Sequence, residues 1–279
     1  MKQGDGHGQV VVIGGAEDRD GEAEILREFV RLAGGARARI SIVATASENA
    51  AEIAASYSEV FQRLGAARAH DLKIFSRKDA DSAEAVAAVE RATGVFFTGG
   101  NQVRITRTLG GTRLDTILHK RHAEGLVLAG TSAGAAMMSS VMITGGPPMS
   151  TLRAGGVELG AGMEFVPGVL IDQHFEERGR LRRLLSAVAQ HPHDIGLGID
   201  ENTAAVVSGH RLEVIGAGTV TIIDAGHLTY TNLNELERDE LLAICGVRIH
   251  VLPAGYRFDL QNREPVTGAP SSDCEGVDI

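Results

Sequence analysis

The segment that most constrains the fold lies at residues 125–136, where a short apolar run meets a cluster of small residues. The run predicts a buried strand, the sequence Gly130-Thr131-Ser132-Ala133-Gly134 predicts a tight turn, and a helix is expected to begin at Ala133. This turn has the pattern G-x-S-x-G, in which a serine occupies a strained strand-to-helix corner with its hydroxyl exposed. A glycine-rich turn whose serine has no catalytic role has the same pattern. Other segments of the chain must therefore distinguish a catalytic turn from a purely structural one.

The composition places the chain among ordinary globular proteins. It has 279 residues, 43% of them hydrophobic and 23% charged, which suits one large domain. A formal net charge of −9 argues against general nucleic-acid binding, which needs a basic face. The chain has neither an apolar run of roughly 18 residues nor the apolar core of a signal peptide, and its two distant cysteines, Cys245 and Cys274, suit a reducing compartment. We therefore expect a cytoplasmic protein that binds neither nucleic acid nor a membrane.

Strands and helices are expected to alternate along the first half of the chain, because continuous apolar runs are separated by amphipathic segments. The expected strands lie at residues 10–13, 39–45, 70–75 and 95–98, and the expected helices at 21–33, 53–64, 82–92, 102–109 and 115–123. This alternation implies right-handed crossovers and an α/β fold, in which a parallel sheet carries helices on both faces.

The pattern changes after the serine turn. Residues 142–168 are rich in glycine and have no helical period. Further strands are expected at 169–172, 203–207 and 220–223, and an arginine-rich helix at about 177–190. The acidic, turn-rich end, residues 268–279, is expected to be disordered. We therefore expect residues 1–279 to form a single α/β domain with a β-rich C-terminal part.

Candidate partners for the serine also follow expected strands. Sites in open α/β sheets form beyond the carboxyl ends of the strands, and a serine nucleophile needs an adjacent base, most often histidine. Among ten histidines, His174 stands out because it follows a buried-looking strand and has Asp172 close by. The acid that would orient this histidine is Asp200 or Glu201, and spacing alone does not choose between them.

Two further segments carry suggestive chemistry. The glycine pair at 99–100 follows an expected strand, so its backbone N–H groups are candidates to join the Ala133 N–H in binding an oxyanion. Four arginines within residues 178–183 are candidates to clamp carboxylates. Without Ser132, a simple tight turn would be the favoured interpretation of the glycines. A solvated helix face with a Glu176–Arg180 pair is the alternative for the arginines.

The order of the candidates along the chain is informative. They occur as Ser132, His174 and then the acid at 200–201, whereas the α/β-hydrolase fold places its acid before its histidine. The residues therefore favour a serine hydrolase site on a different α/β scaffold. We expect no metal and no organic cofactor, because no convincing set of metal ligands accompanies these residues.

Five segments together resemble the cyanophycinases, serine peptidases related to peptidase E. These segments are GGAED at 14–18, FTGGNQ at 97–102, GTSAGA at 130–135, DQHF at 172–175 with the arginines that follow, and GIDENTA at 198–204. They occur in the family's order within residues 10–255. The resemblance implies a class I glutamine-amidotransferase-like, that is flavodoxin-like, core, and a homodimer.

The same resemblance implies a role for each matching residue. Ser132 would be the nucleophile, His174 the general base and Glu201 the acid, while the N–H groups of Gly100 and Ala133 would bind the oxyanion. The substrate-binding positions of the family fall on Gln102, Asp172, Gln173, Arg178, Arg180 and Arg183.

The implied substrate is cyanophycin, a polyaspartate whose side-chain carboxyls carry arginine through isopeptide bonds. Family enzymes cut its backbone and release β-Asp-Arg dipeptides. A polymer of this kind requires both arginine donors and carboxylate acceptors, and the arginines at 178–183 with Asp172 offer both. Two alternatives stay open: a peptidase E-like aspartyl dipeptidase, and a non-catalytic, amidotransferase-like module, although an amidotransferase would need cysteine at position 132. Nucleotide binding at Gly14–Gly15 is disfavoured, because no phosphate-binding spacing follows.

Overall fold

A computed structural model describes residues 7–146 and 151–266 of the chain. Its largest sheet is built from β1 (Val10–Ile13), β2 (Arg39–Val43), β3 (Arg68–Asp71), β4 (Gly94–Phe97), β5 (Val127–Thr131), β10 (Thr203–Ser208), β11 (Arg211–Gly216), β16 (Arg257–Asp259) and β17 (Glu264–Pro265). A second sheet contains β8 (Val169–Gln173), β9 (Ile195–Ile199), β12 (Thr219–Asp224) and β15 (Arg248–Pro253). Two small antiparallel pairs complete the strands: β6 (Val141–Gly145) with β7 (Glu158–Ala161), and β13 (Tyr230–Thr231) with β14 (Ile244–Cys245).

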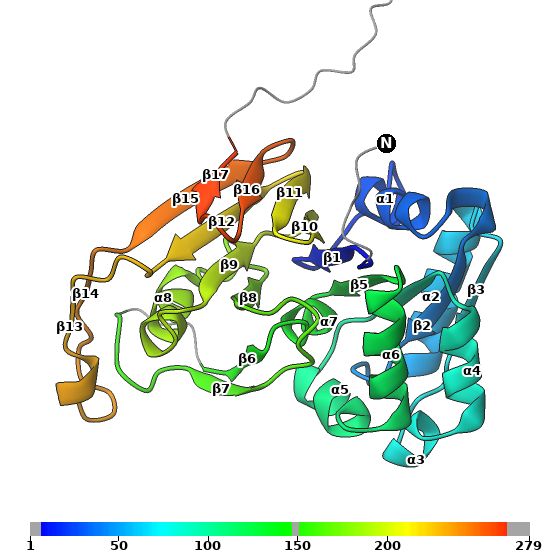
Figure 1. Ribbon diagram of the computed structural model, residues 1–279, viewed down its shortest axis with the longest axis horizontal. Coiled ribbons are helices and arrows are strands. Elements are labelled where there is room, and N and C mark those ends of the chain that lie inside the picture. Colours follow the sequence, from blue (N-terminus) through cyan, green and yellow to red (C-terminus); the bar gives the residue numbers. More distant parts are fainter. Residues whose placement is uncertain (1–6, 147–150, 267–279) are drawn as a thin grey trace, which may run out of the picture.

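Helices cover these sheets (Figure 1). They are α1 (Glu24–Leu32), α2 (Ala50–Arg63), α3 (Arg77–Ala80), α4 (Ala83–Arg91), α5 (Gln102–Leu109), α6 (Arg113–Ala123), α7 (Ala133–Ala136) and α8 (Leu181–Gln190). The predicted alternation of strands and helices is therefore present in the first half of the chain. The fold as a whole is mixed α/β, with a central sheet and flanking helices.

The central sheet has the strand order β17-β16-β11-β10-β1-β5-β4-β2-β3. From β1 to β3 the neighbouring strands run parallel, as the sequence predicted. The other half is antiparallel, beginning with the β1–β10 pair, so an all-parallel sheet is not what the chain forms. Strands β8 and β9 pair in parallel with each other in the second sheet.

Strands β1, β4 and β5 of the central sheet are buried on both faces, which explains why they are continuous apolar runs rather than alternating ones. In β1, Val11 and Ile13 pack into one cluster with the apolar residues of α1 and α2. Val10 and Val12 point the other way and join the apolar residues of α4, α5, α6 and the second sheet. Helix α8 packs Leu184 and Val188 in a third cluster, on the second sheet.

Strand β3 covers Arg68–Asp71, whereas the sequence predicted a strand at 70–75. The Asp71 carboxylate accepts a hydrogen bond from the Lys73 N–H at 2.8 Å, and Lys73 has a positive φ of 53°. Such a local turn ends the strand, because the short acidic side chain replaces a sheet partner for the backbone.

Helix α8 begins at Leu181 rather than at residue 177. Gly179 lies in the left-handed region, with φ 57°, and the Arg178 N–H donates to the His174 carbonyl at 3.2 Å. Residues 176–180 therefore form a turn before the helix. The sequence pattern did not reveal this turn, because arginine and leucine favour a helix wherever the backbone allows one.

The serine turn depends on close approach between backbone segments. A Cβ atom on Gly130 would lie 2.2 Å from the Gly134 carbonyl oxygen, and one on Gly134 would lie 2.3 Å from the Phe97 carbonyl oxygen. The end of β5, the short helix α7 and the end of β4 are thus in direct contact. Small residues are required here for steric reasons.

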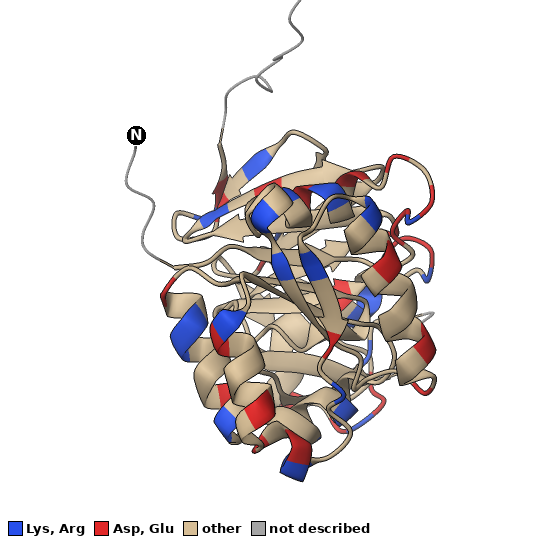
Figure 2. Cartoon of the chain, turned by 90° about the vertical axis from the view of Figure 1, so that its right-hand side faces the viewer, with Lys and Arg blue, Asp and Glu red and all other residues tan. Residues whose placement is uncertain are grey.

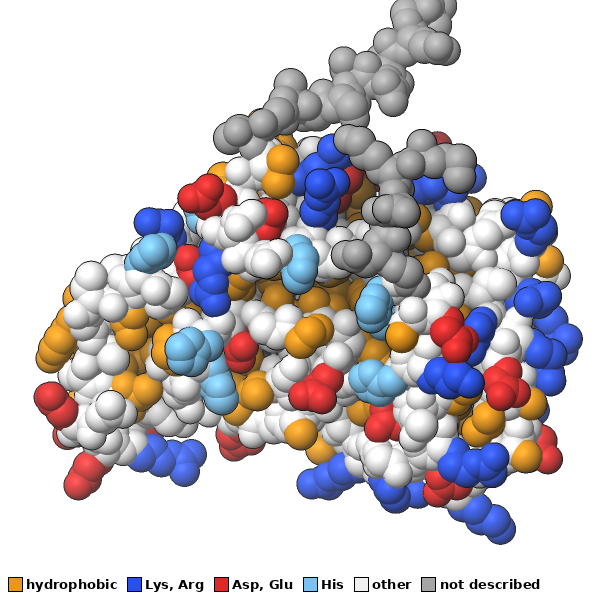
Figure 3. All heavy atoms as spheres, in the orientation of Figure 1, with side chains coloured by type: hydrophobic (Ala, Val, Ile, Leu, Met, Phe, Trp, Pro, Cys, Tyr) orange, Lys and Arg blue, Asp and Glu red, His pale blue; other side chains and the backbone are white. Residues whose placement is uncertain are grey.

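Acidic and basic residues are intermixed on the side of the molecule shown in Figure 2 and on the face shown in Figure 3. Within residues 7–146 and 151–266, no helix combines the length and the apolar character needed to cross a membrane. The tail at 268–279, for which disorder was predicted, lies outside the described residues.

We expect Gly130→Ala to lower the free energy of unfolding by about 3 kcal/mol, because the added methyl group would overlap backbone atoms that cannot move independently. Denaturant unfolding followed by circular dichroism measures this change. Gly179→Ala is the matched control, since a Cβ there meets open space and the cost is that of a left-handed alanine, about 1 kcal/mol. Equal losses in the two variants would contradict the role given to the contact.

Candidate active site

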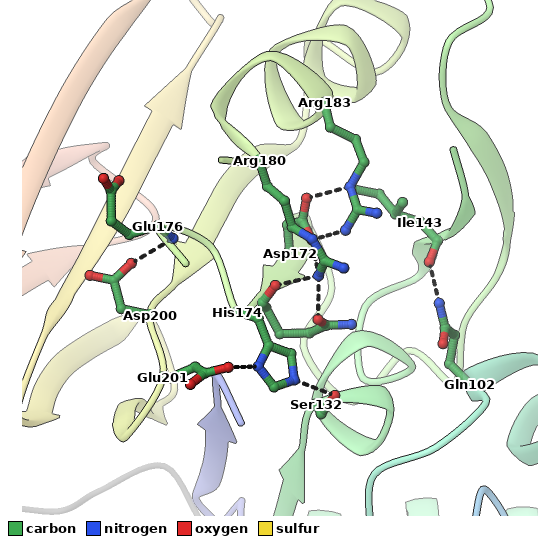
Figure 4. A network of polar contacts seen from close by, with 11 residues as sticks. Gln102, Ser132, Ile143, Asp172, His174, Glu176, Arg180, Arg183, Asp200 and Glu201 are labelled. Carbon is green, nitrogen blue, oxygen red and sulfur yellow. Dashed lines mark hydrogen bonds and ion pairs between the residues drawn. The ribbon is translucent and has the colours of Figure 1, made fainter. Parts of the chain in front are cut away.

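Ser132 occupies the corner between β5 and α7. Its backbone has φ 52° and ψ −110°, a conformation that is strained for a residue with a side chain. The Ser132 N–H donates to the Ile13 carbonyl at the end of β1, at 3.0 Å. The corner holds the serine half-buried, with its hydroxyl directed toward His174 (Figure 4).

Ser132, His174 and Glu201 form a continuous chain of hydrogen bonds (Figure 4). The distance from Ser132 Oγ to His174 Nε2 is 2.9 Å, and that from His174 Nδ1 to Glu201 Oε1 is 2.5 Å. Because the carboxylate accepts, Nδ1 carries the proton and Nε2 is free to accept the serine proton. The His174 side chain is 11% exposed and that of Glu201 35% exposed. This arrangement is able to activate a serine.

The adjacent acid points elsewhere. Asp200 accepts hydrogen bonds from the Thr219 N–H at 2.9 Å and the Thr219 hydroxyl at 2.7 Å through Oδ2. Its Oδ1 accepts from the Glu176 N–H at 3.2 Å. Asp200 therefore connects the turn before α8 to β12, while Glu201 faces His174. Of the two carboxylates that the sequence left open, the structure brings Glu201 to the imidazole.

Three successive carbonyl groups, at residues 13–15, hold the backbone of the site. They accept the N–H groups of Ser132, His174 and Asn202, at 3.0, 2.8 and 2.8 Å respectively. A Cβ on Gly15 would lie 2.3 Å from the imidazole Cε1 of His174, so the ring packs directly on the Gly15 backbone. The Gly14–Gly15 pair thus supports the base and the residue after the acid. Sequence analysis did not assign it this position.

Two backbone segments flank Ser132 where an oxyanion would form. Ala133 is the first residue of α7, and N–H groups in the first turn of a helix have no partner within it. On the other side, a Cβ on Gly99 would lie 3.4 Å from the Ser132 Cβ. Gly100 follows with φ 137°, packed against the Ala46 carbonyl. The two predicted donor residues therefore lie in segments that border the serine.

Asp172, Arg180 and Arg183 form a buried ionic cluster. Arg183 Nε donates to Asp172 Oδ2 at 2.8 Å, and Arg183 Nη2 and Arg180 Nη1 both donate to Oδ1. The Asp172 side chain is 1% exposed and those of the arginines about a tenth exposed. Burial lowers the pKa of Arg180 to about 10, so it stays charged at neutral pH. Asp172 is thus engaged by the protein's own guanidinium groups.

The other predicted substrate-binding residues have different surroundings. The Gln173 side-chain oxygen accepts a hydrogen bond from Arg180. Gln102, the first residue of α5, donates to the Ile143 carbonyl at 2.8 Å (Figure 4). Arg178 lies in the exposed turn before α8. The Glu176–Arg180 pair of the alternative, solvated-helix interpretation is not formed, because Arg180 turns inward to Asp172.

A second polar group beside the serine was not singled out from the sequence. Glu17 is 5% exposed and accepts hydrogen bonds from the Thr131 hydroxyl, at 2.6 Å, and from the Tyr57 hydroxyl. Burial, followed by the charge of Glu17, raises the pKa of Tyr57, so this phenol remains a donor. The available signal was the position of Glu17 two residues after the glycine pair 14–15 that follows β1.

Among the described residues, no three or more His, Cys, Asp or Glu side chains are placed to hold a metal ion.

Comparison with known families identifies the chain. The model of peptidase family S51 matches residues 10–215. The chain belongs to peptidase family S51. It is a serine-type peptidase, and the matched segment contains the Ser132, His174 and Glu201 array.

Curated relatives of this peptidase are named cyanophycinases. The cyanophycinase of Nostoc sp. is 43% identical over 256 residues, which cover 91% of this chain and 86% of that protein. The cyanophycinase of Geminocystis herdmanii is 39% identical over 261 residues, covering 93% and 96%. The similarity therefore extends over nearly the whole length of both proteins.

Solved structures share the fold. A peptidase from an acI-B1 actinobacterium superposes with a TM-score of 0.66 at 24% identity, covering 92% of this chain and 98% of that one. A putative peptidase E from Listeria monocytogenes gives a TM-score of 0.54 at 15% identity, covering 76% and 100%. At these identities the likeness establishes the peptidase E-like fold alone.

We expect Arg183→Met to lower the free energy of unfolding by about 3 kcal/mol, because it removes one partner of a buried charge pair. Arg178→Met, on the exposed turn, is the matched control and should change it by less than about 0.5 kcal/mol. Denaturant unfolding compares the two variants. If Arg183→Met proved as stable as Arg178→Met, the ionic cluster would contribute nothing to the fold.

Proposed function

We propose that this S51 peptidase degrades cyanophycin, cutting the polyaspartate backbone and releasing β-Asp-Arg dipeptides. The observation that carries the proposal is the hydrogen-bonded array of Ser132, His174 and Glu201 in a chain 43% identical to a cyanophycinase over 91% of its length. The hydrogen-bonded array supports a serine-nucleophile mechanism, and the similarity to cyanophycinases supports the substrate class.

In the proposed mechanism, His174 Nε2 takes the proton of the Ser132 hydroxyl as Oγ attacks the backbone carbonyl carbon. The N–H groups of Gly100 and Ala133 stabilise the negative charge that develops on the carbonyl oxygen. The C–N bond then breaks, His174 returns the proton to the departing amine, and an ester links the acyl group to Ser132. Water, deprotonated by His174, hydrolyses that ester. Glu201 holds the imidazole in the required tautomer and stabilises its charged form.

Substrate binding is assigned to the family's positions Gln102, Gln173, Arg178, Arg180 and Arg183. Their polar and cationic groups suit a polymer that carries a carboxylate on every arginyl unit. Because Asp172 is engaged by Arg180 and Arg183, its role in this proposal is to fix these two guanidinium groups.

The family resemblance extends the proposal to the architecture and the cellular context. We infer that residues 1–279 form a single catalytic domain on a class I glutamine-amidotransferase-like core, supported by the serine corner at the carboxyl ends of parallel strands. We also infer a cytoplasmic homodimer. These inferences rest on the resemblance.

The proposal predicts that purified protein releases β-Asp-Arg from insoluble cyanophycin, as identified by the mass of the products. Ser132→Ala should lower kcat by at least about 10⁴-fold, and Glu201→Gln by about 10³–10⁴-fold, because the neutral amide no longer fixes the tautomer. Glu176→Gln, an exposed turn residue whose backbone contact to Asp200 is retained, is the matched control and should keep activity within about twofold.

Two outcomes would contradict the proposal. Hydrolysis of small Asp-X dipeptides without any release from the polymer would favour the aspartyl dipeptidase alternative. Full turnover of cyanophycin by Ser132→Ala would show that Ser132 is not the nucleophile.

A further inference from the structure

A pocket opens beside Ser132, on the side of the serine where Glu17 lies. It has a volume of about 190 Å³, and its lining includes Glu17, Arg19, Tyr57, Gly99, Thr131 and Ser132 itself. We call it the Glu17 pocket. Sites that enclose a whole small-molecule ligand usually measure roughly 300–1,000 Å³, so this pocket is of a size to receive one side-chain group of a larger substrate.

The charge in the Glu17 pocket is unusual for a buried site. Glu17 is 5% exposed, and its two oxygens accept from the neutral hydroxyls of Tyr57 and Thr131. None of the ion pairs formed within residues 7–146 and 151–266 includes Glu17. Buried charges are normally paired with an opposite charge, and each carboxylate oxygen can accept more than one hydrogen bond. The pocket therefore offers an acceptor suited to a cation.

Two other carboxylates of the site already face positively charged or imidazole groups of the protein. Asp172 is bound by Arg180 and Arg183, and Glu201 accepts from His174. Within the described part of the chain, Glu17 instead accepts only from neutral hydroxyls, so it is an acceptor suited to a substrate guanidinium group next to the bond to be cut. The hydroxyl of Thr131, the residue directly before the nucleophile, donates a hydrogen bond to this carboxylate.

We propose that the Glu17 pocket binds the guanidinium group of one arginyl unit of the substrate, adjacent to the scissile bond. This inference rests on the proposed function and deepens it. Arg19 faces the same pocket, with its guanidinium 5.2 Å from the centre of the Tyr57 ring. An arginine joined through its α-amino group keeps a free α-carboxylate as well as its guanidinium, so Glu17 and Arg19 match its two charges.

The test compares two synthetic soluble oligomers of the same length, one built from β-Asp-Arg units and one in which citrulline replaces every arginine. Citrulline has nearly the shape of arginine without its charge. We expect wild-type protein to prefer the arginyl oligomer by at least about tenfold in kcat/KM, as for a charge-assisted hydrogen bond. Glu17→Gln, which keeps the shape and loses the charge, should lower kcat/KM for the arginyl oligomer about 10–100-fold and for the citrullyl oligomer less than about threefold.

Glu52→Gln is the matched control, because Glu52 is exposed at the start of α2, the helix that carries Tyr57. It should leave the preference unchanged. Equal losses on both oligomers in Glu17→Gln would overturn the proposal and leave Glu17 as a support for the serine corner through Thr131. A preference for arginine that survives in Glu17→Gln would also overturn it, since the guanidinium would then bind elsewhere.

A binding measurement distinguishes a failure of this inference from a failure of the proposed function. Failure of the proposed function would appear as no cleavage of either oligomer by the wild type. Calorimetry of β-Asp-Arg and β-Asp-citrulline with Ser132→Ala needs no turnover. We expect the arginyl dipeptide to bind at least about tenfold more tightly, and this difference to disappear when Glu17→Gln is added. Equal affinities for the two dipeptides in Ser132→Ala would refute the pocket assignment, whatever the enzyme cleaves.

Discussion

The active-site arrangement depends on three successive carbonyl groups at the carboxyl end of β1. Those of residues 13–15 accept the N–H groups of Ser132, His174 and Asn202, which come from three segments far apart in the sequence. Each segment is thus hydrogen-bonded either to the last residue of one short, buried strand or to one of the two buried glycines that follow it. The 2.9 Å contact between Ser132 and His174 follows from this common support.

The absence of side chains at Gly14 and Gly15 makes this support possible. The backbone approaches the Asp200 carbonyl on one side and the His174 imidazole on the other, and a Cβ at either glycine would overlap them. Strain is held around the same point, because Ser132, His174 and Asn202 all have a positive φ. Residues in such conformations cost about 1–3 kcal/mol each and persist where the surrounding structure determines them. The buried strands and the Asp172 cluster provide that surrounding structure.

Much of the first half of the fold could be predicted from the sequence, because β1, β4 and β5 are local apolar runs with helices between them. The serine corner and His174 could be named as well, since both lie at strand ends with a recognisable composition. The antiparallel β1–β10 pair could not, because its strands are nearly 200 residues apart and no local pattern specifies their pairing. The helical period also predicted a helix that begins at about residue 177, four residues before α8 begins at Leu181.

The sequence could not predict whether Asp200 or Glu201 faces the histidine, for a geometric reason. Both follow β9, and their side chains point in different directions, Glu201 toward His174 and Asp200 toward Thr219. The pairing of Asp172 with two arginines was hidden for a similar reason, because residues 8 and 11 positions apart meet only after the turn at Gly179 forms. Glu17 was marked only by its position two residues after the glycine pair 14–15, which does not show where its carboxylate points. Each of these features depends on side-chain direction, which residue spacing does not contain.

The most direct test of this account is covalent labelling of the wild-type protein and the Gly15→Ala variant by a fluorophosphonate, with the modified peptide and its rate of formation measured by mass spectrometry. A methyl group at Gly15 would displace the imidazole of His174, and a serine without its general base loses about 10²-fold or more in reactivity. We predict a single adduct on Ser132 in the wild type, formed at least about 100-fold more slowly in Gly15→Ala. Labelling of another residue in the wild type, or an equal rate in the two proteins, would contradict the account.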